Sequence, residues 1–535
     1  MRDGLEEAYR VRDVLTKGVG KLVDNAGVDW WVMMSTRLPG QLDRIVMLRQ
    51  FAQSLDAGEV VYVTRPGFHA SALREILGER LHSFASAPAS GYARLGRYFE
   101  AARKFPLWQL AQTFWDKYDP TLEIRRHFAP RPGPSGTPVV LIPSAYVNVT
   151  RTGLAYARTV PGLSFLLVAA RRSAWTESLP SNVRAGWLAS YASKRNEEPD
   201  AEREEILKKW VLLRRELETE PEIGLSARLG LLDDFAEYLR VGWKARMTWA
   251  EVFRRERIQA VLCADDSNFW TRLPLLLAKN YGVPAVACHH GALDGQRIFK
   301  ENAADVVLAK GQMEKDYLTR VCRIPEAEVA VGAPGQAMDK PSHAAKGAAS
   351  LITFFSEPYE SFSGRGEEFY RDIVPPLAVL AAQTGKRLVV KLHPAESQRE
   401  RSRMIRKLLT TEQLRRIDVL TGPTTTELLQ QTWFGITVLS TVATECAMQG
   451  VPCFLCRWLE YTYQGYIDQF LRFGAGLELK MPSEIAAIPQ TLAKYSFDPA
   501  VAAAVWRPIQ PALLERISSA RPADGRQVAM EMQAR

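Results

Sequence analysis

Cysteine is scarce in this chain of 535 residues. Its six cysteines are scattered from position 263 onward, and only Cys453 and Cys456 have C-x-x-C spacing. Both lie in the run Val-Pro-Cys-Phe-Leu-Cys, which is typical of a buried strand, and no second pair of metal ligands accompanies them. We therefore expect small buried residues rather than a zinc site or a disulfide framework, in a protein of a reducing compartment.

Long apolar runs and an N-terminal leader are missing as well. The chain opens with Met-Arg-Asp-Gly-Leu-Glu-Glu, which lacks the apolar core of a signal peptide. The longest apolar runs, such as 163–170, have the length of strands and fall far short of the roughly 20 residues that cross a bilayer. We expect a cytoplasmic protein whose membrane association, if it has any, is peripheral contact at the cytoplasmic face of the inner membrane.

Several well-known binding motifs are absent. No G-x-x-x-x-G-K-[ST] loop occurs, which argues against P-loop phosphate chemistry. Gly18-Val-Gly20 lacks a preceding strand and a third glycine, so the dinucleotide fingerprint is missing too. No H-x-x-x-H or D-x-D segment presents a convincing metal site, and we expect neither a metal ion nor a cofactor.

The overall composition is that of a globular protein with a moderate positive charge. Apolar residues make up 47% and charged residues 24% of the chain, and its length implies two or three domains. The formal net charge of +9 suits anionic partners such as nucleotides, acidic lipids or polysaccharides, but it is too small to imply nucleic acid. A solvated basic surface accounts for it equally well.

Two series of strands and helices alternate along the chain. Apolar, strand-length runs occur in the first series at 59–64, 139–143, 165–169, 258–264, 282–287, 304–309 and 329–331. A second series occurs at 351–355, 387–392, 417–420, 435–439 and 451–455. Helical patterns separate most of these runs, which predicts α/β domains with parallel, doubly wound sheets.

The domain boundaries follow from composition. The loop 130–138 is rich in Pro and Gly, and 336–349 is small and polar like a linker. We expect a first Rossmann-like domain over 1–340, with a helical insertion around 198–256 and further N-terminal helical elements. A second Rossmann-like domain is expected over 350–500, and a helical tail over 501–535.

Polar residues follow the predicted strands of both series. Ligands of open parallel sheets bind beyond the carboxyl ends of the strands, so these residues are expected to line one cleft between the domains. They are Asp265, Asp266, His289, His290 and Lys310 in the first domain, and Ser356, Glu357, His393, Ser440 and Thr441 in the second. Gly291, Lys310 and Glu357 are expected to line the cleft without a more specific role.

The second domain carries the expected phosphate site. Ser440 and Thr441 precede a helical segment whose N–H groups and dipole favour an anion, although simple helix capping is the alternative. His393 closes a predicted strand, and Pro394 after it ends the strand and fixes the loop. In this position His393 can donate a hydrogen bond to a phosphate oxygen.

Three further side chains belong to this expected donor site. Lys391 and Ser356 are expected to bind the nucleotide or its phosphate. The alternative for Lys391 is that it lies on the other face of its strand as a solvated residue. Glu445, one turn beyond the Ser-Thr pair, either binds a ribose hydroxyl or stabilises the helix dipole.

The catalytic candidates lie in the first domain. His290 can serve as the general base for an acceptor hydroxyl, and Gly291 lets the backbone approach a ligand closely. Asp265 or Asp266 is the rival base, or the nucleophile of a retaining mechanism. The residues alone leave this choice open.

These segments resemble a known group of enzymes. The segments are Cys-His-His290-Gly291, Ala304-Asp305 with Lys310-Gly311, Lys391-Leu-His393-Pro394, and the stretch from Ser440-Thr to Glu445 and Gly450-Val-Pro. In their order and spacing over about 255–475 they resemble the bacterial GT-B transferases of surface polysaccharides. That group includes the capsule Kdo and sialic acid transferases and the polymerases that use CDP-glycerol.

The resemblance implies a GT-B fold and metal-independent transfer from a CMP- or CDP-linked donor. It maps phosphate binding to His393, Ser440 and Thr441, a helix carboxylate to Glu445, and the His-Gly position to His290 and Gly291. The pair Ser440-Thr441 departs from the double serine that is common in the group. The first 250 residues match no family that would identify the acceptor.

The expected function is therefore a glycosyltransferase of capsule or lipopolysaccharide biosynthesis. It moves a sugar, with CMP-linked Kdo- or sialic-type donors favoured, onto a cell-surface glycan or glycolipid. A CDP-glycerol-type polyol-phosphate transferase is the first alternative. A sugar-nucleotide epimerase and a non-catalytic nucleotide-binding scaffold are the others.

Overall fold

The computed structural model describes most of the chain from residue 136 onward and parts of the chain before it. The described residues are 5–6, 9, 12, 22–25, 27–34, 45, 48–63, 68–83, 136–192, 201–219, 221–230, 232–233, 235–335, 349–359, 365–460 and 465–519. Most of the predicted loop 130–138 and of the linker 336–349 lies outside these ranges.

A seven-stranded parallel sheet forms the centre of the first domain. Its spatial order is β5-β4-β3-β6-β7-β8-β9, so the order reverses between β3 and β6. The strands are β3 Val139–Ser144, β4 Phe165–Ala169, β5 Val183–Trp187, β6 Ile258–Cys263, β7 Ala285–Ala287, β8 Val306–Ala309 and β9 Val329–Val331. Reversal of this kind marks the switch point at which open sheets bind ligands.

Both faces of the first sheet are covered, which explains its continuous apolar runs. All six residues of β3 are buried, and alternate residues belong to two separate cores. One core includes α11 (Phe235–Arg255) and α12 (Phe269–Asn280). The other includes α8 (Val147–Thr159) and α23 (Pro511–Ser519). This is the doubly wound arrangement expected from the sequence.

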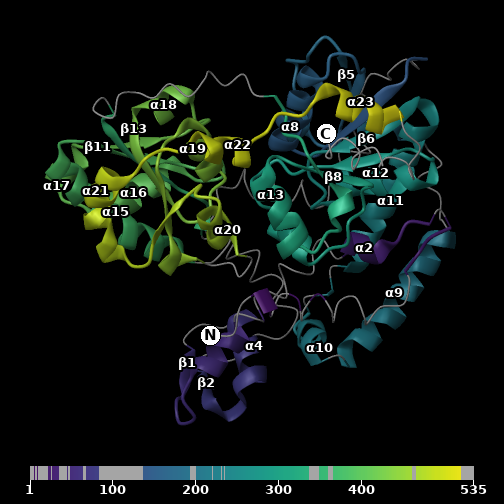
Figure 1. Ribbon diagram of the computed structural model, residues 1–535. Coiled ribbons are helices and arrows are strands. Elements are labelled where there is room, and N and C mark those ends of the chain that lie inside the picture. The colour runs from purple at the N-terminus through teal and green to yellow at the C-terminus, as the bar shows by residue number, and fades with distance from the viewer. Residues whose placement is uncertain are drawn as a thin grey trace.

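A six-stranded parallel sheet forms the second domain, in the order β12-β11-β10-β13-β14-β15. The strands are β10 Leu351–Phe355, β11 Arg387–Lys391, β12 Ile417–Leu420, β13 Thr432–Thr437, β14 Cys453–Cys456 and β15 Leu477–Leu479. The helices around it include α15 Gly366–Thr384, α16 Gln398–Leu408, α19 Val442–Gln449 and α20 Tyr466–Arg472. Two parallel α/β units confirm the predicted GT-B fold class, and they lie side by side in Figure 1.

The six cysteines are all buried and free, two of them in β14. This confirms that they are small core residues.

Helices fill the segment expected to be a helical insertion. They are α9 (Ala201–Thr219), α10 (Pro221–Arg228) and α11. The α9 helix buries a stripe of Ile206, Trp210, Leu213 and Leu217, while its other face is charged. The α11 helix buries one face in a core of the first domain, so the insertion contributes to that core.

The C-terminal segment returns from the second domain to the first. After α22 (Pro499–Val505), Arg507 N donates to Lys310 O at 2.7 Å, and α23 then joins the core beneath the first sheet. The backbones meet so closely that a Cβ on Gly311 would lie 2.3 Å from the carbonyl oxygen of Ala504. Figure 1 shows this crossing in yellow between α22 and α23. Glycine at 311 is therefore required by the packing between the domains.

A small N-terminal unit completes the described structure. Its elements are α4 (Phe68–Leu77) and the parallel strands β1 (Val61–Val63) and β2 (Leu81–Ser83), whereas α2 (Trp30–Met34) packs into the core of the first domain. Among the helices of the described ranges, none combines the length and the apolar character needed to cross a membrane.

Candidate functional site

Loops from the two sheets meet at one place. The loop after β7 carries His289, His290 and Gly291, and the loop after β13 carries Ser440 and Thr441. A Cβ on Gly291 would lie 3.2 Å from Cγ2 of Thr441, so a larger residue would press against the opposite loop. The structure thus brings the loop of Gly291 in the first domain against the loop of Thr441 in the second.

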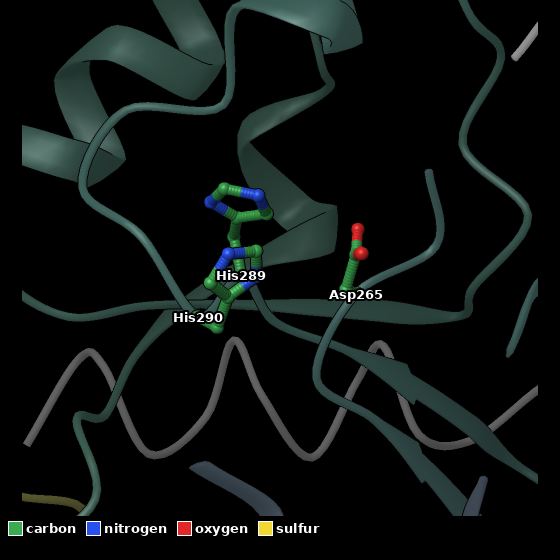
Figure 2. Close-up of side chains that lie close together, drawn as sticks. All are labelled: Asp265, His289 and His290. Carbon is green, nitrogen blue, oxygen red and sulfur yellow. The ribbon is translucent and has the colours of Figure 1, made fainter. Parts of the chain in front are cut away.

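Asp265, His289 and His290 form a compact cluster on the first-domain side (Figure 2). One ligand atom from each side chain lies within 4.8 Å of the others. Asp265 follows β6 and the histidines follow the neighbouring strand β7, so all three leave the same edge of the sheet. Asp265 is fully buried, whereas both histidines are half-buried and are the accessible members of the cluster.

Hydrogen bonds fix the Asp265 carboxylate. The backbone N–H of Ser267 donates to Oδ1 at 2.9 Å, and the Ser267 hydroxyl donates to Oδ2 at 2.8 Å. The hydroxyl of Tyr146 donates to the same Oδ2. Because these donors occupy the carboxylate, Asp265 is better placed to orient its neighbours than to accept a proton from a substrate.

Tyr146 is a site residue that the sequence analysis missed. It follows β3 and immediately precedes α8, and its hydroxyl lies 3.4 Å from Nδ1 of His290. Burial, followed by the charge of Asp265, raises the pKa of Tyr146 far above its usual value, so the hydroxyl stays protonated. The strand-end rule that selected the other residues applies to β3 equally and would have identified Tyr146.

His290 is uncharged at neutral pH. Burial and then His289 lower its pKa to about 4, while Asp265 acts in the opposite direction. With the Tyr146 hydroxyl committed to Asp265, its oxygen can accept a hydrogen bond from Nδ1–H of His290. This tautomer leaves a free lone pair on Nε2, which is the atom a general base needs.

Asp266 does not join the cluster, although the sequence analysis paired it with Asp265. Its carboxylate is fully buried and accepts hydrogen bonds from Arg272 and Lys300, both at 2.8 Å, and from Arg297 at 3.4 Å. Burial alone would raise its pKa, but Arg297, Lys300 and Arg272 lower it far below the usual value. A carboxylate so strongly held in its charged form is a poor proton acceptor. Asp266 instead stabilises the fold by pairing with three buried cations.

Lys310 supports the loop that contacts the second domain. Its Nζ donates to the carbonyl of Gly291 and lies 3.3 Å from Glu314. The sequence analysis expected Lys310 to line the cleft. The structure places its ammonium group against the protein backbone, with its side chain buried.

On the second-domain side, His393 occupies a tight turn after β11. Its backbone N–H donates to Glu396 at 2.8 Å, and its Nδ1 accepts from the N–H of Ala395 at 3.1 Å. Burial, followed by Lys391, lowers the pKa of His393, so the ring is neutral with the proton on Nε2. Pro394 lies within this turn, and the Nε2–H group remains as a donor for a ligand.

Lys391 and Ser356 are engaged by the protein itself. Nζ of Lys391 donates to the carbonyls of Leu392 and Gly422, at 3.0 and 2.6 Å. The Ser356 hydroxyl lies 2.7 Å from Tyr370 Oη and 2.9 Å from a Glu396 oxygen. Both were expected to contact phosphate, and the structure shows them bracing the turns beneath the site.

The first turn of α19 differs from the expected anion site. Val442 N donates to Oγ of Ser440 at 3.4 Å, and Ala443 N and Thr444 N donate to the carbonyls three residues earlier. These N–H groups are therefore less free than the sequence suggests, because the turn is tightened. The Thr441 side chain makes no capping hydrogen bond and is exposed, so its hydroxyl remains available.

Glu445 lies in the same helix. Burial raises its pKa to about 7, although Lys391 lowers it. A carboxyl group that is mostly buried and easily protonated suits a hydrogen bond to a ligand hydroxyl, which is one of the two roles that the sequence left open for it.

Glu357 links the ends of the two central strands of the second sheet. It follows β10, and its Oε2 accepts the N–H of Leu439 at 3.1 Å. Burial raises its pKa to about 8, even though this hydrogen bond acts in the opposite direction. Because the folded-state pKa lies above the usual value of 4.5, the folded protein holds this proton more tightly than the unfolded chain does.

Glu357→Gln should therefore change the pH dependence of stability. The stabilisation from the protonated carboxyl is fully present below the unfolded pKa and is lost as the pH rises through about 8. Since glutamine is neutral at every pH, the variant should match the wild type at pH 4 and exceed it at pH 9 by at least about 1.4 kcal/mol. Urea unfolding at the two pH values measures this difference.

A matched control is Glu412→Gln, an exposed glutamate in α17 (Thr411–Leu414), which should leave the wild-type profile unchanged. If Glu357→Gln also followed the wild-type profile, Glu357 would not be the group that titrates.

One cavity, of about 460 Å³, lies in the N-terminal part of the described structure, between α4 and α10. Its lining residues are Arg49, Ala52, Gln53, Glu75, Ile76, Leu77, Arg80, Leu225 and Arg228. None of them is a candidate site residue, so this cavity is separate from the meeting point of the two sheets.

Comparisons with known proteins give remote structural likenesses alone. No protein-family profile matches the chain, and no curated protein sequence matches it. The UDP-GlcNAc 2-epimerase from Methanocaldococcus jannaschii is 11% identical, with a TM-score of 0.44 over 75% of this chain and 100% of its own. Phytolacca americana UGT2, complexed with UDP-2fluoro-glucose and pterostilbene, is 12% identical, with a TM-score of 0.39 over 74% and 93% of the two chains. Spinosyn rhamnosyltransferase SpnG is 14% identical, with a TM-score of 0.39 over 71% and 100%.

Proposed function

We propose that this protein is a glycosyltransferase that moves a sugar from a nucleotide-activated donor onto a cell-surface glycan or glycolipid. The observation that carries the proposal is the contact between the Gly291 and Thr441 loops. It unites the loop of a neutral histidine beside a buried carboxylate on one sheet with the exposed Thr441 hydroxyl on the other. Acid–base chemistry and phosphate recognition then fall on opposite sides of one site.

On the acceptor side, Nε2 of His290 takes the proton of the attacking hydroxyl. The Tyr146 hydroxyl and the Asp265 carboxylate hold the imidazole in the tautomer that this step requires, and they stabilise the imidazolium that forms. The acceptor oxygen forms a bond to the anomeric carbon. The bond from that carbon to the phosphate oxygen breaks, and the nucleotide leaves with the electron pair.

On the donor side, the phosphate lies near His393 and Thr441. Nε2–H of His393 donates to a phosphate oxygen as negative charge builds up on the leaving nucleotide. Ser440 and Thr441 supply hydroxyl groups, and Glu445 accepts from a ribose hydroxyl. The resemblance of these segments to Kdo and sialic acid transferases favours a CMP-linked sugar as the donor.

A thermal-shift screen with CMP, CDP, UMP, UDP, GDP and ADP tests this assignment. A ligand that binds the native state alone raises the apparent melting temperature by mass action. We expect one cytidine nucleotide to stabilise the wild type and His393→Ala to lose most of that shift. His82→Ala, which alters an exposed histidine of β2, is the control and should retain it.

The outcomes separate the alternatives. A uridine preference would keep the transferase and remove the CMP-linked donor. Conversion of the sugar nucleotide to its epimer without an acceptor would identify an epimerase instead. If no nucleotide shifts the melting temperature, the proposal of a nucleotide-sugar enzyme fails.

A further inference from the structure

The cluster of Asp265, His289 and His290 has a composition that its role in acid–base chemistry does not explain. A base with an orienting carboxylate needs one histidine, yet two lie beside Asp265, with ring centroids 4.5 Å apart (Figure 2). Two imidazole nitrogens and one carboxylate oxygen are the donors that divalent transition ions such as Zn²⁺ prefer. The sequence gives no sign of this set because Asp265 is far from the histidines along the chain.

We propose that Asp265, His289 and His290 bind one divalent transition-metal ion of the Zn²⁺ class, and that the bound ion inhibits the enzyme. The first part stands on the geometry of the cluster alone. The second part rests on the function proposed above.

The distances suit a single ion after small side-chain rotations. The three ligand atoms lie within 4.8 Å of one another. Ligands bonded to one zinc ion at about 2.0–2.2 Å lie at most roughly 4 Å apart. Three protein ligands also leave a position on the ion for water or a substrate oxygen, as in open zinc sites.

The surroundings supply the outer contacts that metal ligands use. Ser267 and Tyr146 orient the Asp265 carboxylate, and outer partners of this kind increase metal affinity. The N–H of Gly291 donates to Nδ1 of His289 at 3.2 Å. Coordination through that nitrogen replaces one long hydrogen bond, which is a small rearrangement.

Metal binding and proton acceptance compete for the same atoms. An ion bonded to the imidazole of His290 occupies the lone pair that would take the acceptor proton. The ion-bound protein is therefore inactive in transfer, and chelation restores activity.

Titration with Co²⁺ tests the site without any assay of activity. We expect the metal-free wild type to bind one Co²⁺ per chain, with the visible absorption bands of a low-coordinate nitrogen and oxygen site. His289→Gln should weaken this binding at least tenfold, and His82→Gln should not change it. Absence of binding at one equivalent, or equal binding by His289→Gln, would overturn the site.

Nucleotide release from the donor tests the inhibition. Zn²⁺ should slow release by the wild type, whereas His289→Gln should keep its turnover in the presence of the ion. A chelator that lowers wild-type turnover would overturn the inhibition and make the ion an activator. If no nucleotide binds at all, the proposed function fails, while the Co²⁺ titration still decides the metal site.

Discussion

His290→Ala is expected to lower the rate of sugar transfer by a factor of about 10²–10⁴, the usual contribution of a general base. The His290 imidazole is neutral, and it is the histidine whose Nδ1 faces the Tyr146 hydroxyl that holds its tautomer. Because the donor nucleotide is proposed to bind on the second sheet, the thermal shift that it produces should be unchanged. Release of nucleotide from the sugar donor, measured with saturating donor, gives the rate.

The comparison with other variants makes this result specific. His82→Ala should retain full turnover, because His82 is exposed in β2. Tyr146→Phe should reduce the rate less than His290→Ala, since it removes the orienting hydroxyl but keeps the base. If His290→Ala turned over at the wild-type rate, proton transfer would have to occur elsewhere in the cluster, at His289 or Asp265.

Asp266→Ala is expected to destabilise the protein by about 3–5 kcal/mol, as removal of one partner from a buried ion pair generally does. The change leaves Arg272, Arg297 and Lys300 buried without their shared carboxylate. Their side chains are no more than 2% exposed, so water cannot replace the lost partner. Urea unfolding of the first domain, monitored by tryptophan fluorescence, measures the loss.

Asp418→Ala is the matched control. Asp418 pairs with Arg387 at 2.6 Å, but both side chains are about half exposed, at 42% and 51%. A surface ion pair of this kind contributes about 0–1 kcal/mol. Equal destabilisation by the two substitutions would contradict the structural role assigned to Asp266.

The fold was largely predictable because its signals are local. Strands such as β3 and β6 are buried on both faces, so they form continuous apolar runs that the sequence displays directly. The sequence missed β5 and β15, which are edge strands of the two sheets. Edge strands pack on fewer neighbours, and their half-buried residues leave a weaker pattern.

The candidate site was predictable as a region and less so as a set of roles. A strand-end position places a residue at the binding edge but does not say which way its side chain points. Asp265 and Asp266 are adjacent in sequence, yet one orients a histidine through Tyr146 and the other holds three buried cations. Their different roles follow from the cations and hydroxyls that the fold brings to each.

The sequence by itself determined the two parallel α/β units and the edge at which polar residues gather, because strand periodicity and chain order are local properties. The tertiary structure alone decided that His290 stays accessible while Lys310, Lys391 and Ser356 are engaged by the protein. It also brought Asp265 to His289 and His290, and Gly291 to Thr441. Those outcomes depend on contacts between distant segments, and hydrogen-bond partners and burial are fixed only when the segments pack.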